Sequence, residues 1–553
     1  MQKVLTAAQM RVVDRLTTEK YGIPAIILME NAAHAVARVI TEKLDGSVRG
    51  KSILILCGPG NNGGDGAALA RILAMEGAYV DALLFGKVEE TKGDARINYG
   101  VLGQNNFEYD DKIYHSNFCE LREIGLKDEW VRFYIDRGQH CDVMVDAIFG
   151  TGLTRPLDTW LYNVLHDINF VNDDADLPKK RLLVAVDIPT GLNADTGEML
   201  AEPFRADVTI AFTAPKPGNV LPGAAEWNSE LVVADIGSPD ELIEAQDSHL
   251  FLTERLDVEE WFENSKFANG SYKNKRGHTL IIAGSESYSG AAVLAGNAAM
   301  RSGVGLVTVV TPKSSRDSVA SRVLPELMVR GVAETDVGSI SEEAFDEIED
   351  LLVKADSVAI GCGLSQDEST KRFVEDVVFT RRQPVIIDAD ALNLLSPFTG
   401  FAVNGESQFP LILTPHEGEF MRLLGTDDKD AIKDRVAAVR DFAVKNNVIL
   451  VLKGEGVLIG EPGGKVVVNP TGNSGLGKAG NGDTLTGILA GFVAQASVMN
   501  IDIFETVVAA VYVAGMAGDI AEEKYGKRVM TASDVRECLT DTFGRLAGNI
   551  DGQ

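Results

Sequence analysis

The sequence predicts an α/β protein in which a doubly wound parallel-sheet domain is followed by a second α/β domain. Short β-branched runs that end in glycine or aspartate alternate with longer helical patterns, which is typical of βα repeats. These runs are apolar throughout, as expected for parallel strands covered on both faces. The repeat stops in a polar, turn-rich stretch at about 237–275 and then starts again, which indicates two domains.

The predicted strands follow in order along the chain. We place the domain boundary at 240, giving domains 1–240 and 241–553, and region 100–140 is the hardest to assign. The strand-bearing stretches of the first domain are 51–60, 79–86, 141–152, 181–191, 206–218 and 230–237, and those of the second are 278–285, 304–312, 355–363, 384–392, 411–419 and 447–456.

Composition narrows the possible partners. The 553 residues include 52 Lys and Arg against 81 Asp and Glu, a formal charge of −29, which disfavours nucleic acid and anionic membrane surfaces. The five cysteines form no CxxC pair, which favours a reducing compartment. The first 22 residues do not resemble a signal peptide, and no uninterrupted apolar run approaches the roughly 18 residues of a membrane span. We therefore expect a soluble, cytoplasmic protein.

A glycine-rich segment, GPGNNGGDG at 58–66, lies between a predicted strand and a predicted helix. In open parallel sheets this junction binds ligands, because free backbone N–H groups and the helix dipole face outward there. Its glycines allow positive φ and close backbone approach, and Asn61, Asn62 and Asp65 add polar oxygens. The alternative is a tight turn with a decorated helix cap. The segment lacks the GxGxxG spacing, so hydride transfer has little support.

Two aspartates, Asp146 and Asp187, each end an apolar strand and precede a glycine-bearing turn. We expect them to converge on the same crevice, although either could be a helix cap or a turn residue. Lys216, in TAPKPG, is another candidate, but a solvated loop lysine is the favoured interpretation.

A second glycine-rich segment, residues 473–494, runs directly into an apolar helix with Asp483 at its entrance. Unpaired N–H groups there could bind phosphate, and a neighbouring aspartate could take a proton from an attacking hydroxyl. The alternative is an N-capping aspartate after a flexible loop.

Two further strand ends carry polar residues. The strand in VILVLKGEG ends at Lys453–Gly456, a second phosphate-facing turn with a cationic side chain. In LTPHEGEF, Pro415 opens a helix and His416 lies in its first turn, beside Glu417 and Glu419, so we favour a ligand contact. The other six histidines have no metal-ligand spacing.

Residues 1–240 resemble the NAD(P)HX epimerase family through GPGNNGGDG, DAIFGTG and AVDIPTG. The resemblance implies a Rossmann-like doubly wound sheet and Asp187 as the acid/base residue. It also implies a potassium ion bound by oxygen donors of Asn62, Asp146 and Thr190. The substrate would be bound by Asn61, Asn62, Gly63, Gly64 and Asp65, and by Gly150, Thr151, Gly152, Leu153, Thr154, Arg155 and Pro156.

Residues 270–550 resemble the ADP/ATP-dependent NAD(P)HX dehydratase family, which has a ribokinase-like fold, through VIIDADALN, LTPHEGEF, KGEG and the GNGD loop. The family's usual GPGLG is GCGLSQ here. Asp483 would be the catalytic base. Substrate contacts would come from Ala291, Gly363, His416, Glu417, Gly418, Glu419, Phe420, Met421 and Arg422. Nucleotide contacts would come from Lys453, Gly454, Glu455, Gly456 and Val457, and from Asn473, Ser474, Gly475, Leu476, Gly477, Lys478, Ala479, Gly480, Asn481 and Gly482.

Together the resemblances imply repair of hydrated nicotinamide cofactors. The first domain would interconvert the two epimers of NAD(P)HX, and the second would use ADP or ATP, with Mg²⁺, to dehydrate one of them. We also expect a homo-oligomer. One alternative is a ribokinase-like kinase of a vitamin precursor, and another makes the first domain a non-catalytic binding module.

Overall fold

The computed structural model describes residues 1–102, 106–109, 112–115, 119–125, 127–172, 181–267, 270–399 and 409–547. The chain divides into two compact units, one of residues 2–248 and one of residues 249–553 with Met1. The division falls inside the polar stretch at 237–275.

The first unit is built on a parallel sheet. Its strand order is β10-β9-β8-β7-β2-β3-β6, and every neighbouring pair runs parallel. The strands are β2 (Ser52–Cys57), β3 (Tyr79–Phe85), β6 (Cys119–Ile124), β7 (Val143–Ala147), β8 (Leu182–Val186), β9 (Val208–Phe212) and β10 (Glu230–Ala234), while β1 (Gln2–Lys3) lies outside this sheet and β4 (Asn106–Tyr109) pairs with β5 (Lys112–His115).

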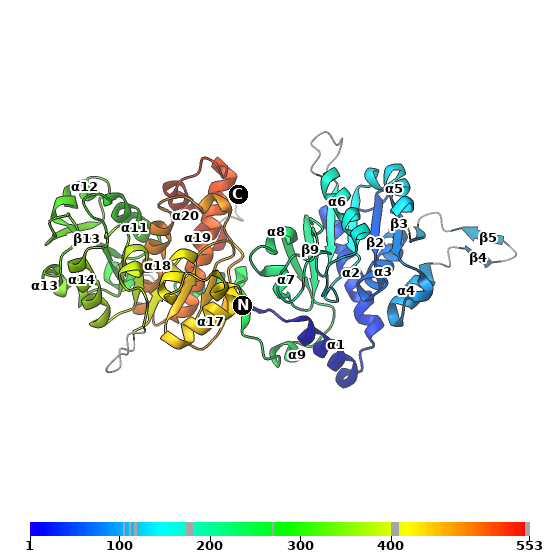
Figure 1. Cartoon of the computed structure of the whole chain (residues 1–553), viewed down its shortest axis with the longest axis horizontal. Coiled ribbons are helices and arrows are strands. Elements are labelled where there is room, and N and C mark those ends of the chain that lie inside the picture. Colours follow the sequence, from blue (N-terminus) through cyan, green and yellow to red (C-terminus); the bar gives the residue numbers. More distant parts are fainter. Residues whose placement is uncertain are drawn as a thin grey trace. The chain divides into compact units, whose positions relative to one another are not determined.

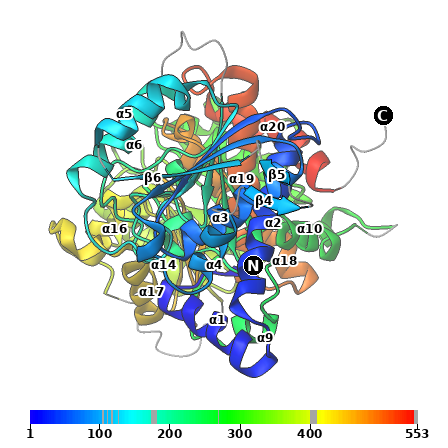
Figure 2. The same cartoon turned by 90° about the vertical axis from the view of Figure 1, so that its right-hand side faces the viewer.

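Helices cover both faces of this sheet, as a doubly wound fold requires. Alternate residues of β2 enter different cores: Ile53 and Ile55 pack with α2 and α3, whereas Leu54 and Leu56 pack with α5 and α6. Figures 1 and 2 show α3 and α4 side by side. The helices are α1 (Ala7–Tyr21), α2 (Ala25–Lys43), α3 (Asn61–Met75), α4 (Gly93–Leu102), α5 (Lys127–Asp136), α6 (Thr159–Asn172), α7 (Pro217–Val220), α8 (Ala225–Asn228) and α9 (Asp240–Glu244).

The second unit has a mixed sheet that is parallel from β18 to β14, with β19 antiparallel to both of its neighbours. Its strands, in spatial order, are β11 (Leu250–Leu252), β20 (Val466–Val468), β19 (Leu458–Gly460), β18 (Ile449–Leu452), β17 (Leu411–Leu413), β16 (Val385–Ile387), β15 (Ser357–Ile360), β12 (His278–Ile282), β13 (Leu306–Pro312) and β14 (Met328–Val332).

The largest core of this unit joins the sheet to a group of apolar helices, among them α11, α18, α19 and α20. Of these, α19 is long and apolar enough to cross a membrane, but most of its apolar stretch is buried, so it serves here as a core helix. The helices are α10 (Arg255–Asn264), α11 (Ser289–Arg301), α12 (Arg316–Ala320), α13 (Ala344–Leu352), α14 (Glu368–Phe379), α15 (Ala389–Leu394), α16 (Glu417–Leu424), α17 (Arg435–Asn446), α18 (Asn481–Met499), α19 (Ile503–Tyr525) and α20 (Ala532–Leu546).

The α/β fold class is confirmed, and each predicted stretch holds a strand. The strands β6 and β14 at two sheet edges were not predicted, because their exposed residues break the apolar run. The strands β11, β19 and β20 were not predicted either, and each is only three residues long. In region 100–140 the described residues form β4, β5, β6 and α5.

Candidate functional sites

In the first unit, Asp187 follows β8 directly, and Asp146 lies near the end of the neighbouring β7. The carboxyl ends of parallel strands share one edge of the sheet, so the two aspartates lie at the same crevice. Asp187 adopts a left-handed backbone conformation, with φ +65°, which is uncommon for a residue other than glycine. Such conformations cluster at functional sites.

Lys216 is the cation of this site, and the prediction of a solvated loop lysine is wrong. Its side chain is only 2% exposed, and Nζ donates to Asp187 Oδ1 at 2.5 Å and to the Phe212 carbonyl at 3.0 Å. The TAPKPG segment follows the neighbouring strand β9 and turns into α7, which carries Lys216 over the strand end. The sequence suggested a polar, exposed loop. Because β9 lies between β8 and β10 in the sheet, the loop that follows it is buried together with Lys216.

The NNGGD residues are helical: α3 begins at Asn61, with Gly60 as its N-cap. Within 58–66, close approach rather than positive φ accounts for the glycines, because none of them has a left-handed backbone. A Cβ on Gly58 would lie 2.0 Å from the Ile148 carbonyl oxygen, and one on Gly63 would lie 1.8 Å from the Gly58 carbonyl oxygen. Close packing thus brings the start of α3 against the turn after β7.

Oxygen atoms of Asn62, Asp146 and Thr190 gather around the Phe149–Gly150 peptide. Thr190 donates to Asp146 through its hydroxyl at 2.8 Å and its backbone N–H at 2.7 Å, and its hydroxyl accepts from the Phe149 N–H at 3.0 Å. A Cβ on Gly150 would lie 3.1 Å from Asn62 Oδ1, and Asn62 Nδ2 is buried with no hydrogen-bond partner in the described part of the chain. This donor set fits a weakly charged, oxygen-seeking cation such as potassium.

Two more acids face the Asp187–Lys216 pair, Asp65 from α3 and Asp14 from α1. Burial, with a contribution from the charge of Asp187, raises the pKa of Asp65 well above its usual range and that of Asp14 to about 6. Lys216 opposes both shifts. Asp14 was not among the predicted site residues, because nothing in the first helix distinguishes it from a surface aspartate.

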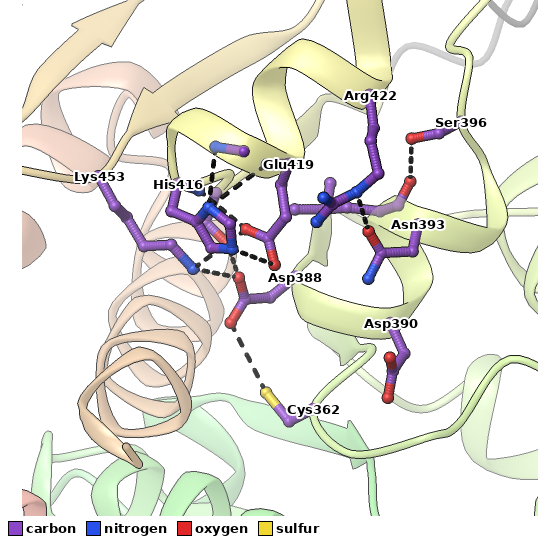
Figure 3. Close-up of polar contacts among 12 residues, drawn as sticks. Cys362, Asp388, Asp390, Asn393, Ser396, His416, Glu419, Arg422 and Lys453 are labelled. Carbon is purple, nitrogen blue, oxygen red and sulfur yellow. Dashed lines mark hydrogen bonds and ion pairs between the residues drawn. The ribbon is translucent and has the colours of Figure 1, made fainter. Parts of the chain in front are cut away.

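In the second unit, the buried carboxylate of Asp388, which directly follows β16, receives donors from several elements (Figure 3). Burial by itself would raise the pKa of Asp388, but Lys453 and two hydroxyls outweigh it and hold that pKa below its usual value. The donors are Lys453 Nζ at 2.6 Å, Thr414 Oγ1 at 2.8 Å, Thr486 Oγ1 at 2.8 Å and, more weakly, Cys362 Sγ at 3.8 Å.

Lys453 follows β18, and two carboxylates lie close to its ammonium group. Besides Asp388, Glu419 Oε2 lies 3.9 Å from its Nζ, and the two carboxylates raise the pKa of Lys453 although burial opposes them. A Cβ on Gly482 would lie 3.6 Å from the same Nζ. The lysine therefore joins the KGEG turn to the start of α18.

Asp483 lies in the first turn of α18, whose N-cap is Gly480, so Asp483 is not the N-capping residue. Burial and the negative charge of Asp388 raise the pKa of Asp483 to about 6, and the thiol of Cys362 and the charge of Lys453 oppose that rise. A carboxylate with a pKa near neutrality can exchange protons readily at physiological pH.

The HEGE segment lies next to the KGEG turn, as Figure 3 shows for His416, Glu419 and Lys453. His416 is the N-cap of α16 rather than part of its first turn: Nδ1 accepts from Gly418 N–H at 3.0 Å, and the backbone N–H of His416 donates to Glu419 at 2.8 Å. Arg422 donates to Asn393 at 2.7 Å.

The remaining predicted residues of this unit lie in two places. Ala291 and Gly363 meet, since a Cβ on Gly363 would lie 3.0 Å from Ala291 Cβ. The 473–482 loop is held by its own contacts: Asn473 donates to Asp519 at 2.9 Å, and Lys478 Nζ donates to the carbonyls of Arg528 and Met530. Lys478 is therefore engaged with backbone oxygens.

Arg435 and Asp388 were not among the predicted site residues. Arg435, at the start of α17, lies 3.6 Å from Glu417 and donates to the Glu455 carbonyl at 3.3 Å, so it joins the HEGE and KGEG segments. Asp388 ends an apolar strand in VIIDADALN, the same signal that identified Asp146 and Asp187, and could have been found. Arg435 gives no comparable signal in a helical pattern.

Each of the two units matches a known protein family. Residues 25–218 match the family described as YjeF-related protein N-terminus, and residues 279–541 match the family described as NAD(P)H-hydrate dehydratase. The bifunctional NAD(P)H-hydrate repair enzyme of Moorella thermoacetica is 36% identical over 99% of this chain and 98% of its own. That of Thermofilum pendens is 33% identical over 99% and 98%.

One solved structure is an ADP/ATP-dependent NAD(P)H-hydrate dehydratase from Bacillus subtilis, co-crystallised with ATP and Mg²⁺. It is 30% identical and covers 54% of this chain and 98% of its own, with a TM-score of 0.46.

Proposed function

Because this chain belongs to the family of bifunctional NAD(P)H-hydrate repair enzymes, we propose that Asp187 and Asp483 carry its two reactions. The first unit epimerises NAD(P)HX, and the second dehydrates one epimer to NAD(P)H. In both units a lysine–aspartate pair at the strand ends lies beside a glycine-lined helix start. In the first unit the aspartate of that pair is Asp187 itself, and in the second the pair is Asp388 with Lys453, next to Asp483 in the first turn of α18.

In the second unit, Asp483 takes the proton from the hydroxyl of the hydrate while that oxygen attacks the terminal phosphorus of ADP or ATP. With ADP the products of transfer are AMP and a phosphorylated hydrate, and loss of phosphate together with a proton from the adjacent ring carbon restores NAD(P)H. The N–H groups at the start of α18 face the phosphates, and Lys453–Val457 and Asn473–Gly482 bind the nucleotide. The raised pKa of Asp483 supports this role.

The substrate of the second unit is bound by Ala291, Gly363 and the His416–Arg422 segment. The contact between Ala291 and Gly363 and the adjacency of His416 to Lys453 support this assignment. Mg²⁺ arrives with the nucleotide, because the phosphate oxygens of ADP or ATP supply ligands that it prefers.

In the first unit, Asp187 is the acid/base residue, and the substrate lies against Asn61–Asp65 and the turn Gly150–Pro156. Thr154, Arg155 and Pro156 are exposed and available to a ligand. Asn62, Asp146 and Thr190 hold potassium, which when bound would supply positive charge beside the reacting ring. The five buried free cysteines are consistent with a reducing, cytoplasmic location.

One assay tests both reactions. The purified chain is given a mixture of NADHX epimers with ADP or ATP, and the absorbance of the regenerated dihydropyridine is followed. Full conversion is expected from the natural sequence. With the Asp187→Asn variant, NADH formation should stop once the epimer that the second unit accepts has been used. The Asp483→Asn variant should regenerate no NADH while still interconverting the epimers.

Two other outcomes would contradict the proposal. A phosphorylated product that accumulates without release of NADH would make the second unit a kinase. Undiminished epimerisation by Asp187→Asn would make the first unit's chemistry independent of that carboxylate. That the chain forms a homo-oligomer stays a prediction, which light scattering of the purified protein tests.

A further inference from the structure

Lys216 is buried in a way that needs an explanation. A lysine ammonium removed from water loses several kcal/mol of hydration unless a carboxylate and further acceptors replace the water. Here the 2% exposed side chain has Asp187 Oδ1 at 2.5 Å and the Phe212 carbonyl at 3.0 Å as its acceptors. The ammonium is thus held between one oxygen of Asp187 and one backbone carbonyl.

The other oxygen of Asp187 faces the substrate turn. A Cβ on Gly150 would lie 3.1 Å from Asp187 Oδ2, and that oxygen accepts no hydrogen bond among the described residues. The Asp187 side chain retains 13% of its exposure. Lys216 therefore occupies the inner oxygen, and the outer oxygen is left for a ligand above Gly150.

A second contact couples the lysine loop to Asp187. Asn219 accepts from the backbone N–H of Lys216 at 2.8 Å, and its amide donates to the Asp187 carbonyl at 3.0 Å. Asn228 accepts from the same amide at 3.1 Å and donates to the Gly218 carbonyl at 3.0 Å. These buried amides hold the backbone of both partners, including the left-handed conformation of Asp187.

The charges around the pair are unbalanced. Asp187, Asp65 and Asp14 face one cation, Lys216. Burial raises the pKa of Asp65 and of Asp14, so protonation of these two relieves the repulsion. Of the three, Asp187 is the carboxylate that the Lys216 ammonium contacts, at 2.5 Å.

We propose that Lys216 is a positioning residue for epimerisation: its ammonium pairs with Oδ1 of Asp187 and leaves Oδ2 turned toward the Gly150 turn, so that Asp187 begins each turnover as a base. The inference rests on the proposed epimerase function of the first unit. It adds a residue, a direction of proton transfer and the oxygen that receives the proton.

The chemistry of the hydrate is consistent with this direction. The hydrated carbon carries both a hydroxyl and the ring nitrogen, so transfer of the hydroxyl proton to Asp187 Oδ2 lets the carbon–nitrogen bond break and an aldehyde form. The electron pair goes to the nitrogen, where conjugation with the ring carboxamide stabilises it. Rotation and re-addition of the nitrogen to the opposite face invert the carbon, and the proton returns to oxygen.

The test compares Lys216→Met, Lys216→Arg and the control Lys43→Met in the full chain. Lys43 belongs to the same unit and pairs with Glu230 at the surface. Epimerisation of purified (R)-NADHX is followed by chromatographic separation of the epimers, without nucleotide. We expect Lys216→Met to lower kcat about 100-fold with little change in KM. The acid limb of its pH–rate profile should move to higher pH, because the neighbouring cation is gone.

Lys216→Arg keeps the charge and should restore part of kcat and the acid limb, whereas Lys43→Met should behave as the natural sequence. If Lys216→Met does not fold, Lys216→Arg decides: an acid limb moved to higher pH despite the retained charge would overturn the inference. Unchanged kcat and pH profile in Lys216→Met would overturn it too. If the natural sequence itself fails to interconvert the epimers, the proposed function of the first unit fails instead.

Discussion

Removing the charge of Asp388 should destabilise the second unit strongly. Asp388→Asn breaks the 2.6 Å contact with Lys453 at a place where the Asp388 side chain is 2% exposed. Loss of one partner of a buried ion pair costs about 3–5 kcal/mol, because the other charge stays buried. Lys453 keeps Glu419 at 3.9 Å, so we expect the lower end, about 3 kcal/mol of the free energy of unfolding.

A double-mutant cycle isolates the pair. Lys453→Met leaves the Asp388 carboxylate with only hydroxyl and thiol donors, and we expect a similar loss of about 3 kcal/mol. With both residues replaced, neither charge is left unpaired. The combined loss should then be about 3–4 kcal/mol rather than about 6, which corresponds to a coupling of about 2–3 kcal/mol.

Urea unfolding measures these losses. Trp261 is the one tryptophan of the second unit, and it stacks on Phe492 in the core. Its fluorescence reports this unit once the other three tryptophans are replaced by phenylalanine. As a control, Arg301→Met removes a surface pair with Glu537 and should cost less than about 1 kcal/mol. A loss under about 1 kcal/mol for Asp388→Asn, or additive losses in the double variant, would refute the reasoning.

Three further predictions concern activity. The rate of dehydration should fall as pH falls below about 6, because Asp483, with its pKa near 6, becomes protonated. In the Asp388→Asn variant the acid limb of the pH–rate profile should move to lower pH, because the negative charge that raises the pKa of Asp483 is gone. A move to higher pH would contradict the assignment. Gly150→Ala should lower the kcat of epimerisation at least tenfold, since its Cβ meets Asn62 and Asp187 at 3.1 Å, while dehydration of the accepted epimer measured with the same sample stays unchanged. Replacing potassium by lithium should slow epimerisation and leave dehydration intact; equal rates in both salts would argue against a potassium site.

The predicted residues came from a local rule, that polar groups after an apolar strand lie at a ligand-binding edge. The rule succeeded for Asp146 and Asp187, whose strands are neighbours in the sheet. It was not applied to Asp388, although VIIDADALN satisfies it. The start of α3 was placed too late because glycines and asparagines have low helix propensity, whereas here close packing against the turn after β7 favours them.

The sequence by itself determined the two α/β units, most strand positions and the two glycine-lined helix starts, because these follow from residue periodicity and backbone chemistry over short stretches. Only the tertiary structure decided which charges meet. Lys216 lies 29 residues after Asp187, at the end of the neighbouring strand β9, and Lys453 lies 65 after Asp388, at the end of β18, two strands away from β16. Each lysine becomes a partner because parallel strands of one sheet end at the same edge. Burial there turns a loop lysine into a buried counter-ion, since the ammonium has exchanged water for a carboxylate.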